Sequence, residues 1–244
     1  MGHLHRLYSH ALGRHVHVWA YGHFGMPVVV FPSASGMASE WDDNGLVHEL
    51  GPLLAAGRIK LYCTESNVSE TWTNFHADAG WRIHRHRQFE TYVHETLVPF
   101  VHHDCRGIMP VGVAGASLGA LYAANLALKS PRLVDWALCL SGRYELRNFT
   151  SGFDNADIYF NNPLAYVPGL HDEALSEARR TWLTLVVGQG PHEGRCIPET
   201  LTFAGQLADK SIPHELDVWG HDSAHEWPWW RRQVAHHFGR RFGG

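Results

Sequence analysis

A serine between two glycines is the residue in this chain best suited to chemistry. Residues 115–119 read GASLG, which is the pattern G-x-S-x-G with Ser117 at its centre. In enzymes that use this pattern, the serine sits on a sharp turn between a strand and a helix and attacks a carbonyl carbon. The pattern is short and Ser117 could instead only cap a helix, so the surrounding residues must decide between nucleophile and cap.

The segments that flank Ser117 favour the nucleophile. An apolar run at 110–116 predicts a strand, and an alanine-rich run at 118–129, stopped by Pro131, predicts a helix. Ser117 would then lie at the carboxyl end of a strand, where parallel sheets bind their ligands. The glycine spacing here is not the G-x-G-x-x-G of a dinucleotide site, which disfavours that alternative.

A nucleophilic serine needs a base, and in this order of elements the base is a histidine near the end of the chain. His225 stands in a loop between a predicted strand at 214–219 and a helix that begins at Pro228. His221 is the rival, but it stands closer to the end of the strand. We therefore expect His225 to accept the proton of the serine.

The third member of a triad is a carboxylate that orients the histidine, and it should follow the predicted strand at 182–188. That loop contains no aspartate, and Glu193 is its best-placed carboxylate. The alternative for Glu193 is a solvated loop residue. Three other carboxylates stand in the next helix, in the last strand and beside the histidine: Glu199, Asp217 and Asp222.

An oxyanion hole needs two N–H groups. The backbone of Leu118, directly after the serine, is the first candidate. The second should come from the small-residue loop at 33–36, after a predicted strand at 27–31, and we choose Ser35. The alternative is a tight turn that only lets the chain leave the sheet.

Strands and helices alternate along the chain after an initial hairpin, which predicts an α/β fold: a mostly parallel, doubly wound sheet with an antiparallel N-terminal hairpin. The segment 143–170 has no clear periodicity and predicts an excursion over the sheet. One domain over residues 1–244 is expected. The remaining predicted strands are 3–9, 14–20, 58–63 and 134–141, and the remaining helices are 45–56, 85–103 and 198–209.

With these residues assembled, the chain resembles the α/β-hydrolase putative esterases, the group that includes esterase D-like enzymes and the mycolyltransferase antigen 85 fold. The motifs that carry the resemblance are VVFPSASG, EWDDNG, GASLGALYAANLAL, LSGRYELRNF, YFNNPLAYVPGL and DVWGHDSAHEWPWWRRQ. It implies Ser117 as nucleophile, His225 as base and a carboxylate near Glu193, although relatives usually carry an aspartate nearer the strand. It also implies that no cofactor is bound and that there is no large lid domain, which agrees with the modest excursion at 143–170.

Composition narrows the classes of partner. The net charge is −4 and the positive residues form no block, which argues against nucleic acid. No apolar run is long enough for a transmembrane helix, and the N-terminus lacks a signal-peptide core. Four scattered cysteines without C-x-x-C spacing suit a reduced, cytoplasmic protein. The H-x-H pairs predict a solvated polar face and no metal site, and the oligomeric state, including a homo-oligomer, stays open.

The predicted function is a serine carboxylesterase that hydrolyses a small or medium carboxylic ester through an acyl-enzyme on Ser117. Two alternatives differ in kind. An acyltransferase of the same fold would pass the acyl group to another alcohol, and a non-catalytic hydrolase-fold protein would only bind its ligand.

Overall fold

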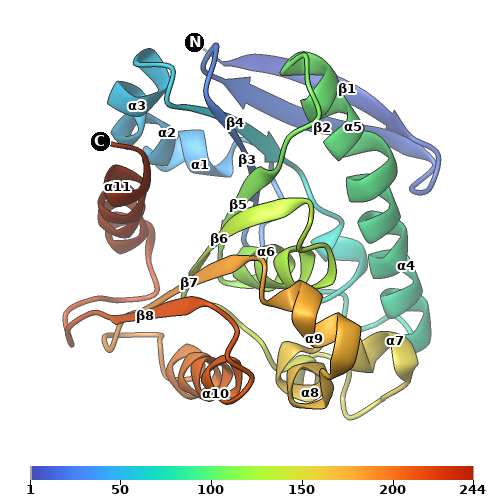
Figure 1. Ribbon diagram of the computed structural model, residues 1–244. Coiled ribbons are helices and arrows are strands. Elements are labelled where there is room, and N and C mark those ends of the chain that lie inside the picture. Colours follow the sequence, from blue (N-terminus) through green and yellow to red (C-terminus); the bar gives the residue numbers. More distant parts are fainter. Residues whose placement is uncertain (1, 244) are drawn as a thin grey trace.

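Eight strands form one sheet in the computed structural model, which describes residues 2–243 (Figure 1). The order across the sheet is β1-β2-β4-β3-β5-β6-β7-β8. The pairs β1–β2 and β2–β4 are antiparallel and the others are parallel, so the sequence-based fold class is confirmed. The strands are β1 (His3–Ser9), β2 (Arg14–Tyr21), β3 (Met26–Phe31), β4 (Ile59–Thr64), β5 (Val111–Ala116), β6 (Val134–Leu140), β7 (Trp182–Val187) and β8 (His214–Val218).

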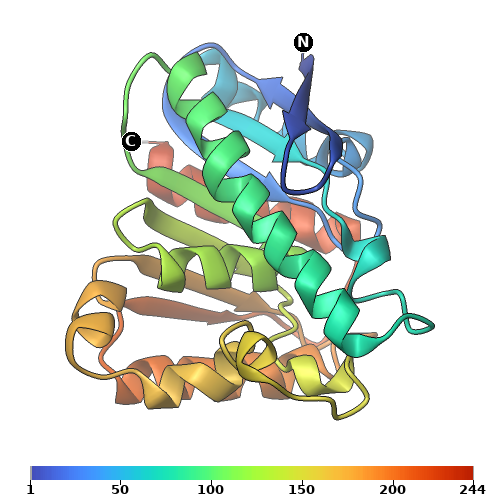
Figure 2. The ribbon, with the colours of Figure 1, turned by 90° about the vertical axis from the view of Figure 1, so that its right-hand side faces the viewer.

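Helices cover both faces of the sheet, which explains why its central strands are continuous apolar runs. In Figures 1 and 2, α1–α3 and α11 lie on one face and α4–α6 on the other. The helices are α1 (Glu40–Asp43), α2 (Leu46–Glu49), α3 (Gly51–Ala55), α4 (Ala79–Tyr92), α5 (Val98–Asp104), α6 (Leu118–Lys129), α7 (Ala156–Tyr159), α8 (Pro163–Tyr166), α9 (Asp172–Ala178), α10 (Cys196–Asp209) and α11 (Trp227–Phe242). Short 3-10 turns η1 (Val68–Glu70), η3 (Leu146–Asn148) and η4 (Val167–Gly169) complete the loops.

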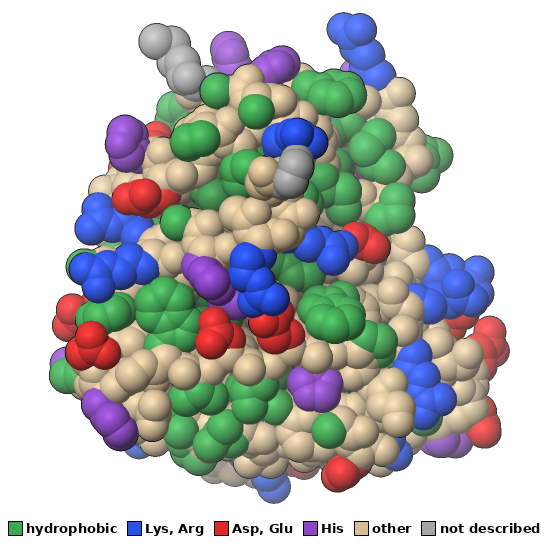
Figure 3. Space-filling model, turned by 60° about the vertical axis from the view of Figure 1, so that its left-hand side comes forward, with side chains coloured by type: hydrophobic (Ala, Val, Ile, Leu, Met, Phe, Trp, Pro, Cys, Tyr) green, Lys and Arg blue, Asp and Glu red, His purple; other side chains and the backbone are tan. Residues whose placement is uncertain are grey.

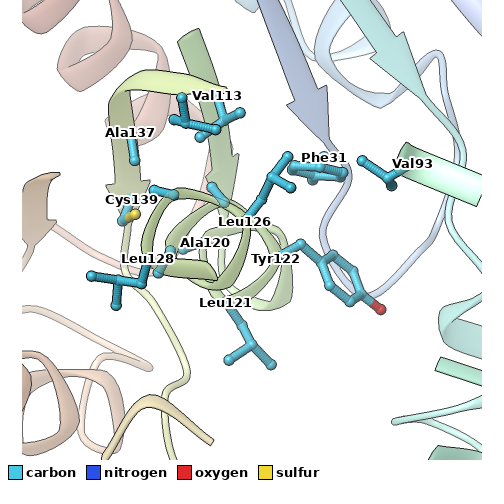
Figure 4. Close-up of a cluster of buried hydrophobic side chains, with 14 of the residues drawn as sticks. Phe31, Val93, Val113, Ala120, Leu121, Tyr122, Leu126, Leu128, Ala137 and Cys139 are labelled. Carbon is cyan, nitrogen blue, oxygen red and sulfur yellow. The ribbon is translucent and has the colours of Figure 1, made fainter. Parts of the chain in front are cut away.

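Each face of the sheet has its own apolar core because successive strand residues point to opposite sides. On β3, Val29 and Phe31 join the core under α4–α6, whereas Val28 and Val30 join the core under α11. Figure 4 shows how α6 fills the first core, with its apolar side chains set against β3, β5 and β6. Eleven of the twelve α6 residues are buried, so the helix that follows Ser117 is held on all sides.

Two predicted helices differ from the structure. The helix expected at 85–103 begins earlier, at Ala79, because Asp78 caps it by accepting the N–H of Trp81 at 2.9 Å. It also passes through a π-helical turn, η2 (Val93–Leu97), before α5. The helix expected at 45–56 is divided into α2 and α3, and Pro52, which has no N–H to donate, stands in the first turn of α3.

The surface carries charges of both signs. On the face shown in Figure 3, Lys and Arg side chains lie among Asp and Glu side chains rather than in one block. Within residues 2–243, no helix combines the length and apolar character needed to cross a membrane.

A buried histidine makes the stability of the fold sensitive to acid. His86 on α4 is 2% exposed and lies against the rings of Trp72 and Tyr122, at centroid distances of 4.8 and 5.5 Å. Burial lowers the pKa of His86 to about 4. In the unfolded chain a histidine takes up its proton near pH 6.5, so acid favours the unfolded state over the interval between these two values.

We expect this histidine alone to remove about 2 kcal/mol of stability between pH 7 and pH 5. The measurement is the free energy of unfolding in urea at both pH values. His86→Gln cannot titrate and should flatten the pH dependence by that amount, whereas His84→Gln, at an exposed position of the same helix, should leave it unchanged. Equal slopes for the wild type and His86→Gln would contradict the prediction.

Candidate active site

Ser117 occupies the sharp turn between β5 and α6. Its φ of 57° and ψ of −116° lie in a region that serine rarely adopts. Its N–H donates to the carbonyl of Leu140 at 2.8 Å, which ties the turn to the end of β6. The residue is half-buried at the carboxyl edge of the sheet. Strained backbone of this kind is a feature of functional sites.

The two glycines of the pentapeptide are required by close packing. A Cβ on Gly115 would come within 2.3 Å of the Gly119 backbone, and a Cβ on Gly119 within 2.5 Å of the Phe31 carbonyl. The start of α6 therefore lies directly against the end of β3, and this brings the loop after β3 beside Ser117.

The loops after β7 and β8 are bound to each other by their backbones. Gly190 donates its N–H to the carbonyl of Ser223 at 2.8 Å, and His225 donates to the carbonyl of Pro191 at 3.0 Å. A Cβ on Gly188 would come within 2.0 Å of the Ser223 carbonyl oxygen, so only glycine fits there. These contacts fix the relative position of the residues that each loop carries.

The result is a close approach between His225 and Glu193. His225 Nδ1 lies 3.5 Å from Glu193 Oε2; the histidine side chain is 20% exposed and that of the glutamate is 0% exposed. Glu193 thus holds the position in which a triad acid would orient the imidazole. Among the described residues, Ser117 Oγ has no hydrogen bond to His225; such bonds are often long in enzymes without substrate.

Two further buried side chains, Ser141 and Trp230, lie beside Glu193 and His225. Ser141 Oγ donates to Glu193 Oε1 at 2.5 Å, and Trp230 Nε1 donates to Ser141 Oγ at 3.0 Å. The ring of Trp230 also packs edge-to-face on His225, with centroids 4.8 Å apart. A buried carboxylate is costly without partners, and these contacts supply them.

Cys196, at the start of α10, lies 3.6 Å from His225 Nδ1 through its sulfur. Burial, and after it the charge of Glu193, raises the pKa of the Cys196 thiol well above its usual range. The thiol stays protonated at neutral pH, which makes it a poor nucleophile.

The rival residues are engaged elsewhere or exposed. Glu199 accepts from Arg143 Nε at 3.2 Å and from the N–H groups of Tyr144 and Glu145 at 2.6 and 3.1 Å. Asp217 accepts from the indole of Trp219 and contacts His237. The remaining two rivals are solvent-exposed: His221 and Asp222.

The loop after β3 is organised by a buried carboxylate that the sequence did not single out. Glu40 accepts the N–H of Ser33 at 2.5 Å and the hydroxyls of Ser33 and Ser35. This occupies the N–H of Ser33, whereas those of Ser35 and Leu118 donate to no group among residues 2–243. Ser35 is exposed, and Leu118 is the first residue of α6.

Within residues 2–243, two groups of side chains have the donor atoms that could hold a metal ion. The first is Glu193, Cys196 and His225, where the carboxylate and imidazole already contact each other. The second is Asp217 with His236 and His237, where Asp217 Oδ2 contacts His237 Nε2 at 3.0 Å. Each group thus contains one contact between a carboxylate and an imidazole.

The chain is similar to a known protein family over most of its length. The family model described as putative esterase matches residues 9–240. A search of curated proteins gives no match.

Solved structures share the fold at low sequence identity. A ferulic acid esterase has a TM-score of 0.75 at 16% identity, with 97% of this chain and 95% of that chain covered. An S-formylglutathione hydrolase from Agrobacterium tumefaciens has a TM-score of 0.73 at 17% identity, with 100% and 95% covered. MPT51 (FbpC1) from Mycobacterium tuberculosis has a TM-score of 0.72 at 16% identity, with 100% and 98% covered.

Proposed function

We propose that this chain, which belongs to the putative esterase family of serine hydrolases, hydrolyses a small or medium carboxylic ester through an acyl-enzyme on Ser117. One observation carries the proposal: the buried carboxylate of Glu193 lies 3.5 Å from Nδ1 of His225, at the same sheet edge as the strained turn of Ser117. Together these three residues have the types and the chain order of a hydrolase triad.

In the first step, Ser117 Oγ attacks the carbonyl carbon of the ester while Nε2 of His225 takes its proton. Glu193 holds the proton on Nδ1, so Nε2 presents a lone pair to the serine. The negative charge on the carbonyl oxygen would be met by the N–H groups of Leu118 and Ser35. Each such donor contributes about 10²- to 10³-fold to the rate.

Collapse of this intermediate breaks the ester C–O bond, and the leaving alcohol takes the proton from His225. In the second step, water attacks the acyl carbon as His225 accepts a proton from it, and the bond to Ser117 Oγ breaks to release the acid. The positive end of α6 lies directly behind the reacting oxygen and favours both anionic intermediates.

Three loops at this edge of the sheet each expose a large apolar side chain: Met37 after β3, Phe75 after β4 and Phe153 after β6. Phe75 lies under Arg82, whose guanidinium carbon is 5.4 Å from the ring centroid. These side chains support an ester with an apolar acyl or alcohol group, because apolar surface of this kind is buried when such a group binds.

The test is the time course of p-nitrophenol release from p-nitrophenyl acetate, butyrate and octanoate. An acyl-enzyme that forms faster than it hydrolyses predicts a burst of one p-nitrophenol per chain, followed by slower turnover. Added glycerol distinguishes the acyltransferase, since a transferase would yield the glycerol ester as its main product. Folded protein that shows neither burst nor turnover above the buffer rate would rule out the esterase and favour a binding protein.

A further inference from the structure

Ser141, one residue beyond the end of β6, is fully buried and has an unusual backbone. Its φ is 48°, again in the left-handed region, and its N–H donates to the carbonyl of Val186 at 2.7 Å. Serine is rarely found in this conformation, which carries a cost in free energy. Ser117 and Ser141 thus both have left-handed backbone at the carboxyl ends of neighbouring strands, and only Ser117 has a role in the proposed reaction.

The direction of the hydrogen bonds at Ser141 follows from the chemistry of its partners. The indole N–H of Trp230 can only donate, so Ser141 Oγ must accept at that 3.0 Å contact. The hydroxyl hydrogen is then free to point at Glu193 Oε1, 2.5 Å away. The chain of donors runs from Trp230 through Ser141 to Glu193.

The two oxygens of Glu193 therefore have different donors. Oε1 accepts from Ser141, which leaves Oε2 facing Nδ1 of His225. Trp230 also contacts His225 directly, because its ring packs edge-to-face on the imidazole with centroids 4.8 Å apart. Each of the four side chains touches two others in this ring, which consists of Trp230, Ser141, Glu193 and His225.

We propose that Ser141 is a positioning residue of the hydrolase site, which holds the Glu193 carboxylate in the rotamer that orients His225. The proposal rests on the proposed function, since it assigns Glu193 as the acid of the triad. Without the hydroxyl, both Trp230 Nε1 and Glu193 Oε1 would be buried without partners. The carboxylate would then be free to turn from the imidazole toward the Cys196 thiol or the indole.

Glycine is the variant that removes the hydroxyl without straining the backbone, since it adopts positive φ readily. For Ser141→Gly we expect kcat to fall about 10- to 100-fold, the size of effect that one hydrogen bond to a charged group supports. KM should change less than about threefold, because Ser141 is fully buried and we expect it not to contact the substrate. Trp230→Phe, which keeps a ring on His225 but loses the N–H, should lie between the wild type and Ser141→Gly.

Ser211→Gly is the matched control. Ser211 also has a positive φ, of 51°, but it is exposed at the end of α10, so its kcat should equal that of the wild type. Thermal unfolding of each variant checks that the fold is retained. A kcat of folded Ser141→Gly within twofold of the wild type would overturn the proposal, as would a loss of kcat that Ser211→Gly shares.

A proton NMR measurement tests the positioning role of Ser141 independently of esterase activity. The Nδ1 proton of His225, held by Glu193, should give a low-field resonance in the proton NMR spectrum of the wild type, absent from His225→Gln. In Ser141→Gly this resonance should shift upfield or broaden through exchange with water. If the wild type hydrolyses no ester but the resonance responds in this way, the proposed function fails and the positioning role stands. An unchanged resonance in Ser141→Gly would refute the positioning role whatever the activity.

Discussion

Replacing Ser117 with alanine is expected to lower kcat for ester hydrolysis about 10⁴- to 10⁶-fold, the loss that follows when a triad nucleophile is removed. The side chain of Ser117 donates no hydrogen bond to the described residues, so its loss should leave the fold intact. The measurement is steady-state hydrolysis of p-nitrophenyl butyrate, with circular dichroism to check folding.

Ser117→Gly is a second variant that removes the hydroxyl group and also relieves the backbone strain. Glycine adopts the φ of 57° without the steric cost that serine or alanine has there. The glycine variant should therefore be as inactive as the alanine variant yet more stable by about 1 kcal/mol. Residual activity of either variant above one hundredth of the wild type would show that another residue is the nucleophile.

Glu193→Gln is expected to lower kcat about 10³- to 10⁴-fold, because an amide cannot hold the imidazole in the tautomer that accepts the serine proton. The substitution keeps the size of a fully buried side chain, so the effect is chemical rather than a loss of packing. Steady-state kinetics across a pH series would measure it.

Asp222→Asn is the matched control for this substitution. Asp222 is three residues from His225 in the chain but exposed, and its loss should change kcat less than about twofold, as is usual for surface substitutions. A large loss in Asp222→Asn together with an active Glu193→Gln would reassign the acid.

Most of the fold could be predicted from the sequence because the central strands are apolar runs bounded by turns. The runs that contain Val29, Val113 and Leu185 became β3, β5 and β7 within a residue of their expected ends. The start of α4 was missed, although Asp78 three residues before Trp81 has the spacing of an N-cap. The π-helical turn that contains His94 has no sequence signal, since it depends on how the two halves of the helix pack.

The residues of the candidate site differ in how well the sequence could indicate them. Ser117 and His225 follow from a motif and from the order of elements, and Glu193 from its place after β7. Ser141 and Glu40 could not be predicted, because their roles arise from partners that only folding brings near. Ser141 is 52 residues from Glu193 and 89 from Trp230 in the chain. Glu40 accepts the N–H of Ser33, seven residues before it, and this contact forms only when the loop folds.

An activated nucleophile at Ser117 would react covalently with a fluorophosphonate, whatever ester the enzyme hydrolyses. Folded protein would be treated with a fluorophosphonate, and its intact mass and modified peptide measured, with Ser117→Ala and heat-denatured protein as controls. We expect one adduct per chain on the peptide that contains Ser117, absent from both controls. A folded wild type that takes up no label, or takes it up at another residue, would show that Ser117 is not an activated nucleophile.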